Sequence, residues 1–162
     1  MFNIKTELYL KIVFLFSLIA LISAYYIEYV LGHQPCNLCL IERIPYGIGI
    51  ILTLSIFLLK KNVRFLILLL ILTFIFSFLI SSYHFGIEQG FFQESAVCGL
   101  KDYTENITKE DLLKQLNEIR VSCKDVTFRI FGLSLTSINI VINIIFIITL
   151  IINYFTYEKN KY

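Results

Sequence analysis

Four cysteines are the residues of this chain whose type and spacing could do redox chemistry. They form two unlike pairs, Cys36 and Cys39 in a C-x-x-C, and Cys98 and Cys123 farther apart in the chain. A disulfide in the C-x-x-C closes a very short ring and gains little from chain entropy, so it suits cycling between dithiol and disulfide. All four cysteines are expected in loops on one side of a membrane. An even number there indicates disulfides in an oxidising compartment.

The C-x-x-C lies where a helix is predicted to begin. Pro35 disfavours helical backbone at the residue before it. Cys39 is expected in the first turn, where free backbone N–H groups and the helix dipole favour a thiolate. Arg43 follows four residues later on the same helical face. It can stabilise an anion near Cys39, either a thiolate or a reduced electron acceptor.

Two other interpretations of the C-x-x-C stay open. One is a static disulfide that only staples the loop. The other is a structural zinc site, although Cys98 and Cys123 lack the knuckle spacing that such sites commonly use for their second pair.

The segment between Cys98 and Cys123 predicts a short amphipathic helix. Thr108 and Asp111 form a capping pattern. Apolar residues then recur at helical spacing: Leu112, Leu113, Leu116 and Ile119. This helix is expected either in the membrane interface or on the span ends. A disulfide between Cys98 and Cys123 is expected to be exposed on this loop, within reach of another protein's thiolate.

Two histidines are also expected on the cysteine side. His33 precedes the C-x-x-C, and His84 ends the third apolar stretch with Glu88 four residues later. An ordinary interfacial role is favoured for His33, and a haem held by both histidines is the less favoured alternative. In the fourth stretch, Asn139 and Asn143 share a helical face and are expected to join helices by hydrogen bonds.

The elements that must position these residues are membrane helices. The chain has 162 residues, of which 57% are hydrophobic, and its mean hydropathy of +0.77 leaves little polar surface for a soluble domain. A membrane span needs roughly 20 mostly apolar residues. Stretches 8–31, 41–59, 65–87 and 133–155 qualify. We therefore predict an all-α, integral membrane four-helix bundle, a single domain of residues 1–162 with two loops on the cysteine side.

The distribution of basic residues predicts the orientation. Lysines and arginines cluster at both termini and in the turn between the second and third spans: Lys5, Lys11, Lys60, Lys61, Arg64, Lys159 and Lys161. These segments should face the cytoplasm, which places loops 32–40 and 88–131 outside it. A cleaved signal peptide ending near Ala24 is less favoured, because apolar residues continue beyond it. The net charge of +2 reflects membrane anchoring and is no sign of nucleic-acid binding.

The residues around the C-x-x-C resemble a known family. The segment Pro35-Cys36-Asn37-Leu38-Cys39-Leu40-Ile41-Glu42-Arg43 is similar to the P-C-x-L-C-x-x-E-R signature of the disulfide bond formation protein B (DsbB) family. These proteins are thiol oxidases of the bacterial inner membrane. The four spans, the longer second loop with its own cysteines, and Gly132-Leu133 before the last span fit the same family.

The resemblance implies an activity and a relay of disulfides. The enzyme would be a membrane thiol:quinone oxidoreductase that reoxidises a periplasmic, thioredoxin-fold, DsbA-like partner. The reduced partner would attack the Cys98–Cys123 disulfide at Cys98. Cys123 would then exchange with the first pair through Cys36.

The same resemblance implies a quinone site. The Cys39 thiolate would give electrons to ubiquinone or menaquinone in the lipid bilayer, and Arg43 would help to hold the quinone. His84 falls where the family has a histidine near the end of the third span, which implies a place beside the quinone. Both termini would be cytoplasmic, and the cysteine loops periplasmic.

The chain also departs from the family pattern, and two alternative functions remain. It contains no tryptophan, and Phe91-Phe92 and Phe128 stand where relatives often have one. A relative of vitamin K epoxide reductase also combines four helices with a C-x-x-C, but there the motif usually lies near the last span. A non-catalytic membrane scaffold stapled by disulfides is the third hypothesis.

Overall fold

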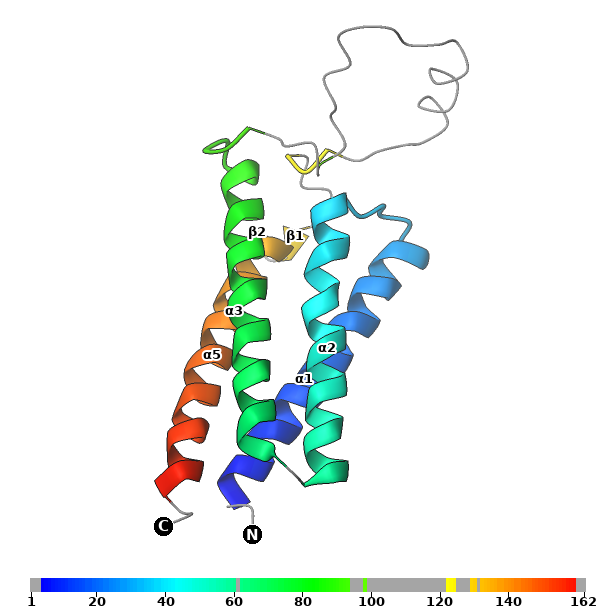
Figure 1. Ribbon diagram of the computed structural model, residues 1–162. Helices are drawn as coiled ribbons and strands as arrows, with labels where there is room; N and C mark the ends of the chain where they lie inside the picture. The colour runs from blue at the N-terminus through cyan, green and yellow to red at the C-terminus, as the bar shows by residue number, and fades with distance from the viewer. Residues whose placement is uncertain are drawn as a thin grey trace, which may run out of the picture.

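The computed structural model describes residues 4–60, 62–93, 98, 122–124, 129–130 and 132–159. Within this part of the chain, four long helices run the length of the bundle (Figure 1). They are α1 (Ile4–Tyr29), α2 (Asn37–Leu59), α3 (Val63–Glu88) and α5 (Leu135–Lys159). Each contains a stretch long and apolar enough to cross a membrane. The predicted four-helix architecture is confirmed, and the chain is a multi-pass membrane protein.

The helices pack around an apolar core. α3 lies between α2 and α5, and α1 crosses behind α2 at an angle (Figure 1). Phe74 of α3 is fully buried, with its ring centroid 5.0 Å from that of Phe146 on α5. Many large apolar residues on the outer surface are exposed. Lipid tails are as apolar as these side chains, so close packing and interhelical hydrogen bonds hold such helices together.

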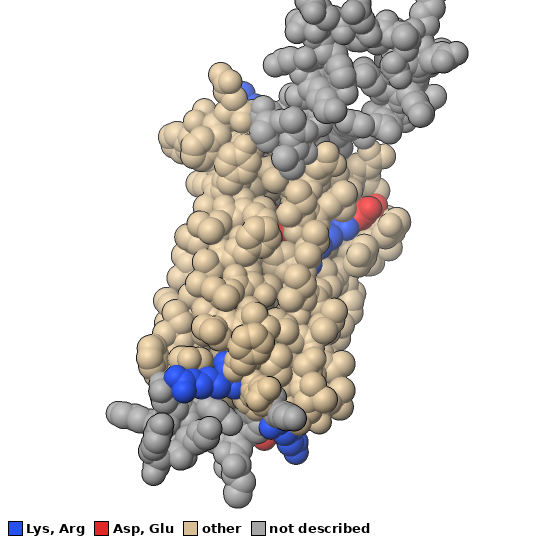
Figure 2. Space-filling model, viewed as in Figure 1, with Lys and Arg blue, Asp and Glu red and all other residues tan. Residues whose placement is uncertain are grey.

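The bundle has two different ends. α1 begins and α5 ends at the same end, and the α2–α3 turn lies there too (Figure 1). In that turn, Lys60 and Asn62 both have left-handed backbone, with φ of 48° and 53°. Figure 2 shows basic side chains gathered at this end, below a broad surface with little charge. The C-x-x-C lies at the opposite end of the bundle.

The second helix begins earlier than the predicted span 41–59. Cys36 is its N-cap, and α2 starts at Asn37, so Cys39 lies in the first turn of the helix, as predicted. The expectation that all four cysteines lie in loops is therefore wrong for Cys39. The reason is local, because the Cys36 sulfur accepts a hydrogen bond from the backbone N–H of Cys39 and so caps the helix at this point.

The fourth helix begins two residues later than predicted. Strands β1 (Arg129–Ile130) and β2 (Leu133–Ser134) form a short antiparallel hairpin, and Gly132 in its turn has a φ of +82°. Ser134 then caps α5, because its Oγ accepts a hydrogen bond from the backbone N–H of Ser137 at 3.2 Å.

The other helix ends shift by up to four residues, since α1 begins at Ile4 and α5 ends at Lys159, where 8 and 155 were predicted. α1 ends at Tyr29 instead of residue 31, and α3 extends to Glu88, a residue expected in the loop. After α3, the N–H of Phe91 donates to the carbonyl of Gly86, and the N–H of Gly90 donates to the carbonyl of Ile87. This pair of hydrogen bonds is a Schellman motif. The predicted amphipathic helix of residues 108–119 lies outside the described residues.

Candidate redox site

The four cysteines come together in one buried cluster. Cys36, Cys98 and Cys123 are only 5%, 3% and 2% exposed, and they pack with Leu38 and Ile87 while Cys39 lies against them. The sequence predicted an exposed pair at Cys98 and Cys123, and this is wrong. Both residues are covered because they dock where α2 begins and α3 ends.

The first turn of α2 directs its free backbone N–H groups at sulfur atoms. The N–H of Cys39 donates to Cys36 Sγ at 3.3 Å, and the N–H of Leu38 donates to the sulfur of Cys123. Cys39 Sγ lies 2.9 Å from Cys36 Sγ. The helix N-terminus was expected to favour a thiolate at Cys39. In the structure its N–H groups instead point at the sulfurs of Cys36 and Cys123.

These contacts change the acidity of the two thiols outside the spans. The pKa of Cys36 lies well below its usual range, first because the Cys39 thiol donates to its sulfur and then because His84 adds a second hydrogen bond. Burial raises the pKa of the Cys123 thiol, and the hydrogen bond with Cys98 acts in the same direction. Cys36 therefore holds negative charge more readily than Cys123.

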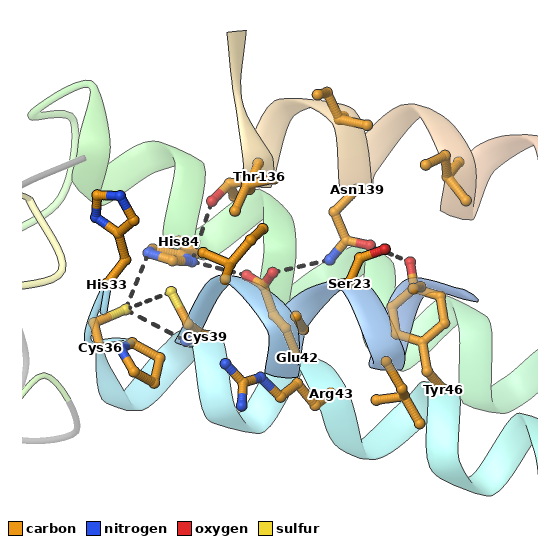
Figure 3. Close-up of a pocket in the computed structure, with 18 of the residues that line it drawn as sticks. Ser23, His33, Cys36, Cys39, Glu42, Arg43, Tyr46, His84, Thr136 and Asn139 are labelled. Atoms are coloured by element: carbon orange, nitrogen blue, oxygen red, sulfur yellow. Dashed lines mark hydrogen bonds and ion pairs between the residues drawn. The ribbon is translucent and has the colours of Figure 1, made fainter. Parts of the chain in front are cut away.

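His84 links the cysteines to a carboxylate on α2. Its Nε2 lies 3.6 Å from Cys36 Sγ, and its Nδ1 lies 2.8 Å from Glu42 Oε1 (Figure 3). With Nδ1 donating to Glu42, Nε2 accepts from a Cys36 thiol when the ring is neutral and donates to a thiolate when it is charged. The side chain is buried, so His84 belongs to the site.

A polar network extends from Glu42 to α5. Asn139 Nδ2 donates to Glu42 Oε2 at 2.9 Å and to Ser81 Oγ at 2.8 Å. Tyr46 donates its hydroxyl to Asn139 Oδ1 (Figure 3). The helix-joining role expected for Asn139 is what these contacts provide. The role of Glu42 in this network was not predicted from the sequence, although a carboxylate inside an apolar span marks a functional position.

A second buried carboxylate lies on the other side of His84. Thr136 Oγ donates to Glu88 Oε1 at 2.6 Å, and Oε1 is 3.9 Å from His84 Nε2. Glu88 Oε2 is buried without a hydrogen-bond partner among the described residues. Nothing in the sequence beyond the four-residue spacing from His84 indicated that Glu88 and Thr136 would join the site.

Arg43 is held in place from α1. It donates to Glu28, and its guanidinium carbon lies 5.1 Å from the centroid of the Tyr25 ring. The side chain is 15% exposed. Arg43 is therefore a nearly buried cation one helical turn after Cys39, as the spacing predicted.

These residues surround a cavity of about 360 Å³. Cys36, Cys39, Glu42, Arg43 and His84 form its polar end. Its remaining wall is largely apolar and comes from α1 and α5: Phe16, Ile19, Ala20, Leu21, Ala24, Ile27, Leu135, Ile138 and Ile142. His33 also lines the cavity (Figure 3). The cavity can hold a molecule with a polar head and an apolar body, next to the C-x-x-C.

Replacing Asn139 by leucine should destabilise the bundle more than the same change at Asn143, one turn later. Asn139→Leu leaves Glu42 Oε2 and the Tyr46 hydroxyl without their partner, which costs about 2 kcal/mol. Asn143→Leu removes one neutral hydrogen bond, from Asn143 Nδ2 to Asn139 Oδ1, for about 0.6 kcal/mol. Reversible unfolding in mixed micelles measures both, and equal losses would contradict this account of the network.

Comparisons with known proteins agree with these features. A family model described as disulfide bond formation protein DsbB matches residues 6–153. An uncharacterized protein of Rickettsia prowazekii (strain Madrid E), RP370, is 31% identical over 147 residues. That alignment covers 90% of this chain and 86% of the relative.

Proposed function

The chain belongs to the DsbB family of membrane oxidoreductases for disulfide bond formation, and on this premise we propose that it is a thiol:quinone oxidoreductase. It would reoxidise a periplasmic DsbA-like partner and pass the electrons to a membrane quinone. The observation that carries the proposal is the contact between the four-cysteine cluster and the cavity at the start of α2.

The buried cluster fits the internal step of the relay. The partner's two thiols would reduce the Cys98–Cys123 disulfide and leave as a disulfide, and the dithiol so formed would reduce the Cys36–Cys39 disulfide through a Cys123–Cys36 bond. Cys36 and Cys123 share one cluster, with their sulfurs at the first turn of α2. Attack by the partner needs Cys98 uncovered, so the pair must leave this cluster during each cycle.

The second half-reaction would use the cavity. Cys36 and Cys39 both line it, so a Cys39 thiolate would lie at its polar end. The Arg43 guanidinium would hold and stabilise a negatively charged oxygen there, and His84 can donate a hydrogen bond or a proton. A bound quinone supplies the acceptor for the two electrons and two protons of the dithiol.

The residues of the cavity fit such a ligand. The head of a quinone carries hydrogen-bond acceptors and its tail is apolar, which matches a polar end followed by the apolar walls of α1 and α5. Cys39, Arg43 and His84 would contact the head. Ubiquinone and menaquinone both meet this description.

We further propose the bacterial inner membrane as the location. The basic residues at the end where α1 begins and α5 ends would face the cytoplasm. The cysteine cluster at the opposite end would then face the periplasm, where disulfides persist and where the partner would dock.

Purified protein mixed with a reduced DsbA-like partner and ubiquinone or menaquinone should consume the quinone catalytically. Cys39→Ser should abolish this reaction, because it removes the thiolate next to the cavity. Absorbance of the quinone follows the reaction, and non-reducing gels follow the partner's thiols. Substantial turnover by Cys39→Ser would overturn the relay. Failure of the wild-type protein with both quinones, despite intact disulfides, would favour a stapled scaffold or a different partner.

Removing the Arg43 charge should affect only the quinone half-reaction. Arg43→Met should raise the KM for quinone about tenfold, since a hydrogen bond to a charged group contributes about 1.5 kcal/mol. The KM for the partner should change less than about twofold. Steady-state kinetics with each substrate varied in turn separate the two effects.

Arg64→Met is the matched control for Arg43→Met. Arg64 also lies 5.1 Å from a tyrosine ring, that of Tyr154, but at the opposite end of the bundle. Its replacement should leave both KM values unchanged. An equal rise in the quinone KM for the two variants would remove Arg43 from the quinone site.

A further inference from the structure

We propose that the reduced C-x-x-C and His84 form a binding site for Zn²⁺, and that zinc bound there arrests the enzyme in its reduced form. The ligand atoms of Cys36, Cys39 and His84 all lie within 4.8 Å of one another. Two thiolates and one imidazole are a common donor set for zinc. This site differs from the two-knuckle zinc site weighed from the sequence, because its third ligand comes from α3 instead of the second cysteine pair.

The sulfur–nitrogen distance fits a tetrahedral ion, and the sulfur–sulfur distance needs a small adjustment. With Zn–S near 2.3 Å and Zn–N near 2.05 Å, a tetrahedron places sulfur and nitrogen about 3.6 Å apart and two sulfurs about 3.8 Å apart. Cys36 Sγ and His84 Nε2 are 3.6 Å apart. The sulfurs of Cys36 and Cys39 are 2.9 Å apart, so they must separate by about 1 Å. Cys39 borders the cavity and has room for that movement.

The surroundings of His84 are those of a metal ligand. Its Nδ1 contacts the Glu42 carboxylate at 2.8 Å, which turns Nε2 toward the cysteines. Such a carboxylate–histidine pair orients and strengthens histidine ligands in zinc proteins. Two thiolates also neutralise the two charges of the ion, which matters at a buried site. All three ligands line the cavity, so a water molecule there can complete the tetrahedron.

Zinc binding at this site depends on the redox state. The metal replaces whatever protons the two thiols still carry, and no electrons are transferred. A Cys36–Cys39 disulfide has no thiolate to offer, so the oxidised enzyme lacks the site. Metal-bound sulfurs can neither form their disulfide nor exchange with Cys123, and turnover stops. Binding needs only the reduced cysteines, so it can be tested whether or not a quinone is the acceptor.

The experiment uses full-length protein in detergent with Cys98→Ser and Cys123→Ser, so that Cys36 and Cys39 are the only thiols. The chain is reduced, freed of reductant under nitrogen, and titrated with Zn²⁺ against a chromophoric chelator. It should bind one zinc ion per chain. Co²⁺ should give the thiolate-to-cobalt absorption and the visible bands of a tetrahedral site. Both readouts are independent of catalytic activity.

Variants made in the same background identify the ligands. Cys36→Ser and His84→Gln should each weaken zinc binding at least about 100-fold, because each removes a ligand, and Glu42→Gln should weaken it about 10- to 100-fold. Ser55→Ala is the control on the same helix. The Ser55 hydroxyl is exposed and bonds the carbonyl of Ile51, away from the cavity and the Glu42 network, so the zinc affinity should be unchanged.

The oxidised form of the same chain tests the proposal without any further substitution. It should bind no zinc in the range where the reduced form is saturated. Equal binding by the two forms would overturn the proposal. So would an unchanged zinc affinity and cobalt spectrum in His84→Gln, because the imidazole would then not be a ligand.

Discussion

A carboxylate in the apolar part of a membrane protein is stable only when other groups pair with it. Glu42 meets this requirement through His84 on α3 and Asn139 on α5. Asn139 in turn accepts a hydrogen bond from the hydroxyl of Tyr46 on α2. These bonds set α2, α3 and α5 in one relative position. They also turn His84 Nε2 toward Cys36, so the geometry of the redox site depends on how this one charge is satisfied.

In the proposed relay, the buried cysteine cluster must open before a partner can reach Cys98. Cys98 and Cys123 are covered at the start of α2, where the backbone N–H of Leu38 contacts the Cys123 sulfur. This arrangement suits exchange with Cys36 but hides Cys98 from a partner. Among the described residues, the pair packs on Leu38 and Ile87, whereas the network around Glu42 joins α2, α3 and α5 through other side chains. Docking and release of the pair would then alternate in each cycle.

The four spans and the C-x-x-C at the start of a helix could be predicted from the sequence, because span length and N-terminal turn signals are local properties. The position of Arg43 one helical turn after Cys39 was also predicted, since residues four apart share a helical face. The contacts of Glu42, Glu88 and Thr136 could not be predicted from the sequence, because they depend on how α2, α3 and α5 are rotated about their axes. The burial of Cys98 and Cys123 likewise arises from tertiary docking. The hydrophobic pattern of a sequence does not determine where a polar loop packs on the rest of the protein.

In the proposed relay, electrons cross from the second cysteine pair to the first between Cys123 and Cys36. The most direct measurement leaves only these two thiols, in the Cys39→Ser/Cys98→Ser double variant, and maps disulfides by mass spectrometry after mild oxidation in membranes. We expect a Cys36–Cys123 disulfide within each chain. Two free thiols, in a protein that remains folded, would contradict it.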